Sequence, residues 1–306
     1  MNATPIRVAV LGPGGVGGLV AALLARQGDS VQVLASDDTA REIARDGLRV
    51  ESRKYGDFEV RVDSGGRLFG PVDVCFVTVK ATHLAQALER VPPAELGAGL
   101  IVPFLNGIDH VELLRSAYPP GSVVAATIRV ETARVGPGAI RHTSPFAVIE
   151  IGPSKEHHDR VVVLADHLAA AGFEVRLRAD EIGMLWDKFA LLEPLALLTT
   201  HEGANVGVIR TRRREDVVAL VTEIASVARA EGASVDVEAV VGLFDSVPAT
   251  MESSMQRDQA AGRPLELDAL GGAVVRHAAR AGIEVPVTSR IVNELRERNR
   301  LAQPGG

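Results

Sequence analysis

The chain has 306 residues, of which 46% are hydrophobic and 24% are charged, and its net charge is −6. This is an ordinary globular composition, with enough residues for two domains. The negative balance argues against a nucleic-acid-binding surface and against a basic membrane-binding surface. The arginines of "RTRRRED" at residues 210–216 stand beside Glu215 and Asp216. We therefore interpret this segment as a solvated helix face.

The usage of cysteine and of long apolar runs indicates a cytoplasmic protein. The only cysteine, Cys75, lies in the apolar run "VDVCFVTVK", so a disulfide within one chain is excluded. No signal peptide is expected, because the first residues lack the basic-then-apolar order of such a segment. The apolar run 184–200 carries charged residues and Pro194, which argues against a membrane span. The eight histidines show no metal-ligand spacing, so no metal site is predicted.

Short apolar runs alternate with helical segments in the first part of the chain. Strands are expected at 7–12, 30–35, 72–80 and 99–107, with helices at 16–28 and 82–91. The run 123–133 continues the β-rich pattern. Such alternation predicts an α/β fold with a parallel sheet and helices on both of its faces.

The last part of the chain has helical periodicity. Helices are expected at 181–200, 213–231, 236–258, 265–281 and 287–301. We predict a Rossmann-type dinucleotide-binding domain at 1–178, followed by a mainly α-helical substrate and catalytic domain at 179–306. The apolar helices could form the core of the second domain or the interface of a homodimer, and the pattern leaves both open.

A glycine-rich loop lies between the first expected strand and the first expected helix. The spacing Gly12-x-Gly14-x-x-Gly17 in this context is typical of a dinucleotide-binding turn. Gly12 permits the tight turn, Gly14 lets the backbone approach a pyrophosphate, and Gly17 lets helix and strand pack closely. The predicted cofactor-binding residues of the loop are Gly12, Pro13, Gly14, Gly15, Val16 and Gly17.

The choice between NADP and NAD depends on the end of the second strand, in "VLASDD". An acidic residue there binds the ribose diol of NAD, whereas an arginine receives the 2′-phosphate of NADP. Ser36 could bind a phosphate and Asp37 could bind a diol. Local chemistry therefore leaves both cofactors open.

The segment "GMLWDKFALLEPLALLTT" at 183–200 places Lys188 among apolar residues. In a helix beginning near Asp180, Lys188 shares an apolar face with Met184, Leu185 and Leu192. Its side chain either extends along this face to water or lies in an enclosed site. In an enclosed site, desolvation lowers the pKa of a lysine and makes it a better proton donor near neutral pH.

Seven motifs in a common order resemble the ketopantoate reductase (2-dehydropantoate 2-reductase) family. They are "GPGGVG" (12–17), "VTVKA" (77–81), "LNG" (105–107), "PGAIRH" (137–142), "WDKF" (186–189), "SSM" (253–255) and "LELDALGG" (265–272). The resemblance covers most of the chain. It implies NADPH-dependent reduction of a small-molecule 2-oxo acid, with ketopantoate as the family's substrate in pantothenate biosynthesis.

The resemblance also implies the roles of individual residues. Lys188 would be the general acid that protonates the carbonyl oxygen, and Asn106 would lie between nicotinamide and substrate. Ser254 would bind the substrate, Lys80 would lie near the cofactor, and Glu266 would interact with the cofactor or the catalytic network.

This sequence departs from the family's pattern at positions that would contact the substrate and at one that would contact the cofactor. Leu192, Ala196 and Val206 occupy positions where the family usually has asparagines, although Asn205 could replace the third after a shift of one residue. These changes favour a more apolar 2-oxo acid or an imine as an alternative substrate. Ser36 stands where the family often has an arginine, which leaves NAD open beside NADP. A non-enzymatic nucleotide sensor of the same fold is a third hypothesis.

Overall fold

The computed structural model describes residues 4–302, which divide into two compact units. The first unit comprises the chain up to Leu105 together with His110–Glu181, and the second comprises Asn106–Asp109 and the chain from Ile182 onward. The boundary expected between residues 178 and 179 remains a prediction. The segment Asn106–Asp109, which the sequence analysis placed in the first domain, packs within the second unit.

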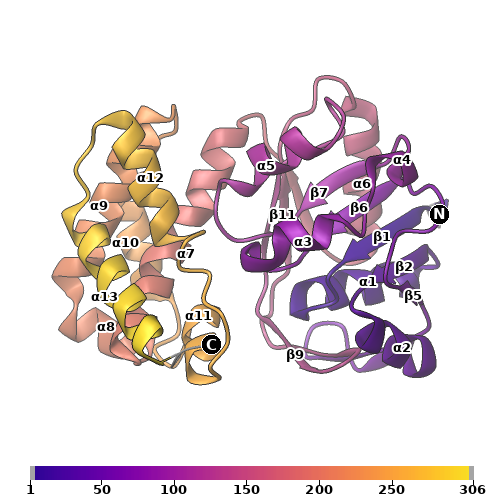
Figure 1. Cartoon of the computed structure of the whole chain (residues 1–306), viewed down its shortest axis with the longest axis horizontal. Helices are drawn as coiled ribbons and strands as arrows, with labels where there is room; N and C mark the ends of the chain where they lie inside the picture. The colour runs from indigo at the N-terminus through magenta and orange to yellow at the C-terminus, as the bar shows by residue number, and fades with distance from the viewer. Residues whose placement is uncertain (1–3, 303–306) are drawn as a thin grey trace. The chain divides into compact units, whose positions relative to one another are not determined.

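A five-stranded parallel sheet forms the centre of the first unit (Figure 1). Its strands are β1 (Arg7–Leu11), β2 (Ser30–Leu34), β5 (Asp63–Gly65), β6 (Val74–Val77) and β7 (Leu100–Pro103), in the order β5-β2-β1-β6-β7. Val10 of β1 pairs with Val33 on one side and with Phe76 on the other. The continuous apolar runs that predicted these strands arise because a parallel sheet is buried on both faces.

Successive residues of β1 enter two different cores. Val8 and Val10 belong to a buried cluster shared with the helix Gly15–Gln27, whereas Ala9 and Leu11 belong to one shared with the helices Leu84–Leu88 and His110–Ala117. The helices of this unit are α1 (Gly15–Gln27), α2 (Asp37–Asp46), α3 (Leu84–Leu88), α4 (Pro93–Leu96), α5 (His110–Ala117) and α6 (His158–Ala170), with a 3₁₀ turn at Ala81–His83. The predicted α/β class with helices on both faces of a parallel sheet is therefore confirmed.

Two further sheets in the first unit were not predicted as sheets, although the run 123–133 was expected to be β-rich and contains one of their strands, β8. One has the order β4 (Phe58–Val60), β3 (Leu48–Ser52), β10 (Ala139–His142) and β9 (Thr132–Gly136), and the other has β12 (Glu174–Leu177), β11 (Val148–Ile151) and β8 (Ala126–Arg129). Both mix parallel and antiparallel pairs. Their strands are short, and β3, β9 and β12 carry exposed residues, so these three strands lack the apolar runs that identify the central sheet.

The second unit is built from helices, as the sequence predicts (Figure 1). They are α7 (Glu181–Glu202), α8 (Val206–Arg212), α9 (Arg214–Ala230), α10 (Val237–Ser246), α11 (Ser254–Ala260), α12 (Gly271–Ala281) and α13 (Pro286–Ala302). Phe189, Val221, Phe244 and Leu295 are fully buried in one cluster. The apolar faces of these helices therefore build the core of the unit itself.

Three of the predicted helices are wrong in extent. The segment 236–258 contains two helices, because Val247 is extended before Pro248 and Ser253 caps the start of α11. The segment 265–281 becomes helical only at Gly271, after a turn in which the Leu270 N–H donates to the carbonyl of Glu266. The predicted helix at 82–91 is likewise shorter and consists of the 3₁₀ turn and α3.

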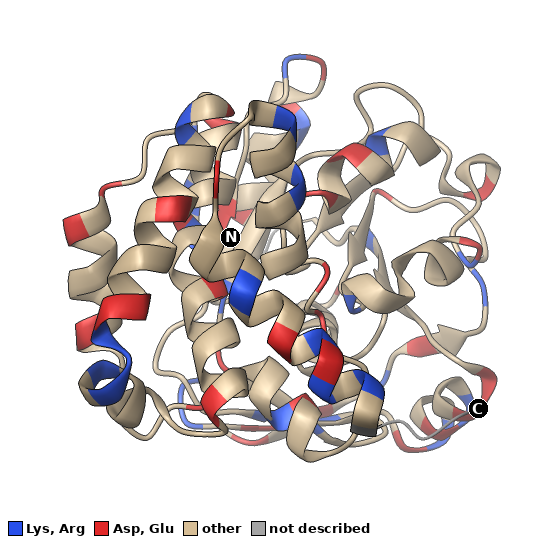
Figure 2. Cartoon of the chain, turned by 60° about the vertical axis from the view of Figure 1, so that its left-hand side comes forward, with Lys and Arg blue, Asp and Glu red and all other residues tan. Residues whose placement is uncertain are grey.

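The arginine-rich segment 210–216 is paired with carboxylates. Arg213 bonds to Glu202 and to Asp216, and Arg214 pairs with Asp245 at 2.5 Å. Figure 2 shows acidic and basic residues interspersed along the helices. Within residues 4–302, no helix is both long enough and apolar enough to cross a membrane.

Candidate active site

The glycine loop after β1 forms the tight turn that the sequence predicts. Gly12 has a φ of +92°, and the Gly14 N–H donates to the Gly12 carbonyl at 2.8 Å. Thr78, one residue beyond β6, donates its hydroxyl to the same carbonyl at 2.7 Å. A Cβ on Gly17 would lie 2.3 Å from that carbonyl oxygen, so any larger residue would separate α1 from the turn.

The start of α1 offers backbone donors for a phosphate. The N-cap residue is Gly14, and among the described residues no side chain caps this end of the helix. A Cβ on Gly14 would have no neighbour within 4 Å, so the backbone here is open to a ligand. Uncapped N–H groups at the positive end of a helix of this length bind a pyrophosphate well. The loop therefore fits a dinucleotide cofactor.

Two opposite charges lie near the end of β2, where cofactors are discriminated. Asp37 is the exposed first residue of α2, after the N-cap residue Ser36. Arg90 donates from Nη1 to the carbonyl oxygens of Ala35 at 2.9 Å and Gly66 at 2.6 Å. The sequence analysis missed Arg90, because it follows α3 and no local signal connects it to β2.

Lys80 lies at the carboxyl end of the same sheet. It follows β6 by a few residues and is the N-cap residue of the 3₁₀ turn Ala81–His83. The carboxyl ends of β1 and β6 therefore carry the glycine loop, Thr78 and Lys80 within one unit. Ligands of open α/β sheets bind at these strand ends.

In the second unit, Asn106 and Glu266 contact each other directly. The Asn106 side chain donates from Nδ2 to Oε2 of Glu266 at 3.3 Å. Glu266 is only 6% exposed, so its carboxylate is largely shielded from water. Gly107, the residue after Asn106, has a φ of +91°, and a Cβ there would lie 2.6 Å from the carbonyl oxygen of Ala269. Glycine at 107 allows this close approach and lets Asn106 reach the carboxylate.

Lys188 lies in the first half of α7 and is half-buried. Its helix segment is anchored by Trp186 and Phe189, whose rings meet edge to face with centroids 5.5 Å apart. One turn and two turns later, Leu192 is half-buried and Ala196 is buried. The lysine is thus followed along the helix by apolar side chains rather than by amides.

The two remaining predicted substrate residues lie at helix starts. Ser254 is the exposed first residue of α11, and Asn205 caps α8 by accepting the Val208 N–H at 3.2 Å. The neighbouring Ser253 is buried, and its hydroxyl oxygen accepts bonds from Thr199 at 2.8 Å and from the Gln256 N–H. Substrate roles for Ser254 and Asn205 remain predictions.

Glu193 is a buried carboxyl that the sequence analysis did not single out as functional. It lies in α7 before Pro194 and is 0% exposed. Neither of its oxygens has a hydrogen-bond partner within the described part of the chain. Burial, followed by repulsion from Glu223, raises the pKa of Glu193 to about 8. The protonated, neutral form of the residue is therefore favoured at neutral pH.

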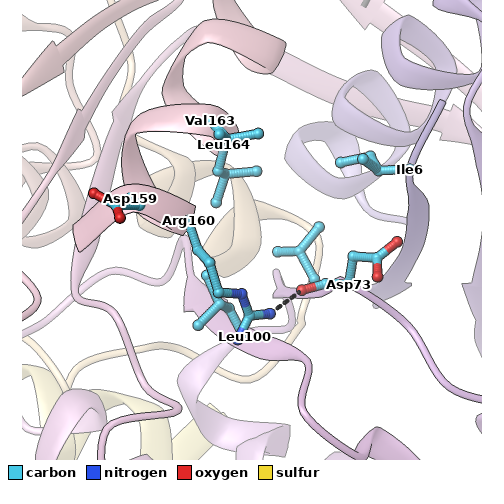
Figure 3. A pocket seen from close by; sticks show the side chains of 8 residues that line it. Ile6, Asp73, Leu100, Asp159, Arg160, Val163 and Leu164 are labelled. Atoms are coloured by element: carbon cyan, nitrogen blue, oxygen red, sulfur yellow. Dashed lines mark hydrogen bonds between the residues drawn. The ribbon is translucent and has the colours of Figure 1, made fainter. Parts of the chain in front are cut away.

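Figure 3 shows a hollow in the first unit. Its volume is about 250 Å³, and it is lined in part by Ile6, Asp73, Leu100, Arg160 and Leu164. These residues lie at the amino ends of β1, β6 and β7 and on α6. Cofactors bind at the opposite, carboxyl ends, so this hollow is not the dinucleotide site. Among residues 4–302, no cluster of histidine, cysteine and acidic side chains is arranged to hold a metal.

Comparisons with known proteins agree across both units. The family profile "Ketopantoate reductase PanE/ApbA" matches residues 8–156, and the profile of its C-terminal part matches residues 181–299. The 2-dehydropantoate 2-reductase of Mycobacterium tuberculosis is 32% identical over 93% of this chain and 95% of its own. The uncharacterized oxidoreductase YkpB of Bacillus subtilis is 30% identical over 94% of this chain and 96% of its own.

Solved structures share the fold. A D-mandelate dehydrogenase in a ternary structure with NADH and anilino(oxo)acetate has a TM-score of 0.91 and 19% identity, covering 97% of this chain and 99% of its own. At this identity, the likeness concerns the fold alone. The two profiles together with the relatives establish the family, and the chain therefore belongs to the ketopantoate reductase family of oxidoreductases, which act on CH–OH groups.

Proposed function

We propose that this protein reduces a 2-oxo acid with NADPH, and that its substrate is ketopantoate, which it converts to pantoate in pantothenate biosynthesis. The contact between Asn106 and Glu266 carries the proposal, because the resemblance assigns both residues to one site although they are far apart in sequence. The open glycine turn at the start of α1 supports the choice of a dinucleotide as the reductant.

The reaction needs a hydride, a proton and a group that stabilises developing negative charge. The glycine loop at the start of α1 would hold a nicotinamide cofactor, which would supply the hydride for the ketone carbon. The ammonium of Lys188 donates the proton to the carbonyl oxygen and stabilises the charge that develops there. The amide of Asn106, held by Glu266, orients the reacting groups, and Ser254 and Asn205 bind the polar end of the substrate.

A second candidate substrate is a more apolar 2-oxo acid or an imine. Leu192 and Ala196 follow Lys188 on α7 by one and two turns. Neither side chain can form hydrogen bonds with a substrate hydroxyl or carboxylate. A site without such partners discriminates weakly in favour of a hydroxylated substrate. This observation favours a substrate whose side chain is hydrocarbon.

NADH is a second candidate reductant. Asp37 is exposed at the start of α2 and carries the type of group that binds a ribose diol. Ser36 and the guanidinium of Arg90, held against the Ala35 carbonyl, favour the 2′-phosphate of NADPH instead. Lys80 adds a second positive charge in the same unit.

Oxidation of NADPH and of NADH by the purified protein tests these proposals. The assay uses ketopantoate, 2-oxoisovalerate and phenylglyoxylate at matched concentrations, with and without enzyme. Highest kcat/KM with ketopantoate and NADPH supports the proposal as stated. Turnover of phenylglyoxylate or 2-oxoisovalerate without turnover of ketopantoate selects the apolar substrate. No oxidation with any 2-oxo acid contradicts reduction of this class of substrate.

A further inference from the structure

The segment Asn106–Asp109 is attached to the helical unit at both of its ends. Asn106 bonds to Glu266 at one end, and the Asp109 carboxylate bonds to two residues of α12 at the other. Between these ends, Gly107 lies against the Ala269 carbonyl, and Ile108 is buried in the core of the helical unit. The position of the Asn106 amide therefore depends on how firmly Asp109 is held.

His277 of α12 lies between two carboxylates. Its Nε2 is 2.7 Å from Oδ1 of Asp109, and its Nδ1 is 2.8 Å from Oε1 of Glu231. A carboxylate only accepts hydrogen bonds, so both ring nitrogens must donate, and only the imidazolium form can do this. The His277 side chain is 12% exposed, which limits the screening of these charges by solvent.

The surrounding groups favour the charged ring. The hydrogen bond to Asp109 has the largest effect on the pKa of His277 and raises it. Burial lowers this pKa, and the hydrogen bond to Glu231 raises it. Arg280 on the same helix acts in the opposite direction, and from α7 the neutral ring of Trp186 meets the imidazole edge-on at 6.0 Å. The bond from His277 also lowers the pKa of Asp109 to about 2.

Arg276 is a weaker support for the same carboxylate. Its Nη2 lies 2.6 Å from Oδ2 of Asp109, but the side chain is 44% exposed and also pairs with Asp268 at 2.9 Å. On α13, Arg296 contacts that same Asp268 at 3.2 Å. Exposed ion pairs contribute little, and His277 is the less exposed of the two partners of Asp109, so we take His277 as the main anchor of this carboxylate.

We propose that His277, as an imidazolium bridging Asp109 and Glu231, is a positioning residue that fixes the segment carrying Asn106. This inference rests on the proposed function, in which the Asn106 amide orients the reacting groups. His277 itself contacts neither substrate nor cofactor. Its protonation holds the segment, and loss of the proton as pH rises through the raised pKa leaves one of the two carboxylates without a donor.

We call the bridge from His277 to Asp109 and Glu231 the clamp. The two clamp variants His277→Gln and Asp109→Asn test it. His277→Gln removes the positive charge. The glutamine amide cannot donate to Asp109 and to Glu231 from two opposite sides as the imidazolium does. The matched control is His201→Gln, because His201 also lies between two carboxylates of the helical unit, 3.2 Å from Glu202 and 2.5 Å from Glu294. Circular dichroism establishes that each variant is folded, and Asp109→Asn decides alone if His277→Gln does not fold.

Hydrogen–deuterium exchange of the peptide covering residues 104–110 is the readout that needs no activity. Exchange of this peptide should become faster in both clamp variants and remain at the wild-type rate in His201→Gln. For the reaction, kcat/KM should fall about 10- to 100-fold in the clamp variants, because the Asn106 amide is misplaced. The decline of wild-type kcat/KM above the pKa of His277 should be absent from His277→Gln.

The outcomes separate this inference from the proposed function. Wild-type exchange rates together with a wild-type pH profile in His277→Gln would overturn the clamp while leaving the reductase proposal intact. If the wild-type protein shows no turnover, the proposed function fails, and the exchange comparison alone decides whether His277 holds the segment. Equal acceleration in His201→Gln would likewise overturn the clamp.

Discussion

The Asn106 amide donates a hydrogen bond to the buried carboxylate of Glu266 at 3.3 Å. This bond fixes the rotation of the amide, because an oxygen acceptor selects the Nδ2 side of the group. The amide oxygen then faces away from the carboxylate, so a group that contacts it must be a hydrogen-bond donor. The pair therefore predetermines which polar groups a substrate or nicotinamide can present to Asn106.

Glu266→Gln should reduce activity without unfolding the protein. The amide has the size of the carboxyl group but loses the charge that holds Asn106, so misorientation should lower kcat/KM by about 10- to 100-fold. Steady-state kinetics and thermal unfolding should be compared with those of Glu284→Gln, a change at an exposed glutamate of the same unit. Loss of activity that follows loss of stability in both variants would contradict a specific orienting role.

The buried carboxyl of Glu193 should make stability depend on pH. Its pKa is raised from 4.5 to about 8 by burial and then by Glu223. Glu223 accepts bonds from the Val287 and Thr288 N–H groups, so its charge is tied to the start of α13. Between these two values, the unfolded state releases a proton that the folded state keeps. The free energy of unfolding should therefore fall with rising pH, by up to about 1.4 kcal/mol per pH unit, and level off above pH 8.

Glu193→Gln should remove this component. The variant should show a flatter dependence of its urea midpoint on pH between 5 and 9, and at pH 9 it should be more stable than the wild-type protein. Equilibrium urea unfolding at pH 5, 7 and 9 measures this, with Glu284→Gln as the exposed control. A pH slope in Glu193→Gln equal to that of the wild-type protein would show that Glu193 ionises normally in the fold.

Asp37 should set the balance between NADH and NADPH. Asp37→Ser removes a negative charge that repels a 2′-phosphate and loses a partner for the ribose diol. The ratio of kcat/KM for NADPH to that for NADH should rise about tenfold, which corresponds to about 1.4 kcal/mol. Asp38→Ser is the matched control, because Asp38 is next to it, is 85% exposed and pairs with Arg41. An equal change in both variants would mean that Asp37 has no specific contact with the cofactor.

The sequence predicts the central sheet well because its signal is local. Residues 7–12 and 72–80 are largely apolar, and they contain the strands β1, buried after its first residue, and β6, buried throughout. The helix expected at 236–258 fails because Pro248 and the Ser253 cap interrupt an otherwise helical pattern. A pattern of apolar residues alone does not identify such an interruption.

The site was predictable only in part. The glycine turn has a local spacing with a physical reason, so Gly12, Gly14 and Gly17 could be assigned directly. The contact of Asn106 with Glu266 joins distant segments, and only the family resemblance indicated it. His277 and Arg90 were missed, because their partners are distant in sequence and neither residue lies in a recognisable motif.

The rate of NADPH oxidation by Lys188→Ala is the sharpest test of Lys188 as the proton donor of a reductase. Because Lys188 is the proposed proton donor, Lys188→Ala should lower kcat with the best 2-oxo acid by about 10²- to 10⁴-fold. The Kd for NADPH should stay at the wild-type value. Lys155→Ala, at an exposed lysine, controls for loss of charge and should retain full activity. We expect a loss of this size in Lys188→Ala alone. Turnover in Lys188→Ala equal to that of Lys155→Ala would contradict the assignment of Lys188 as the proton donor.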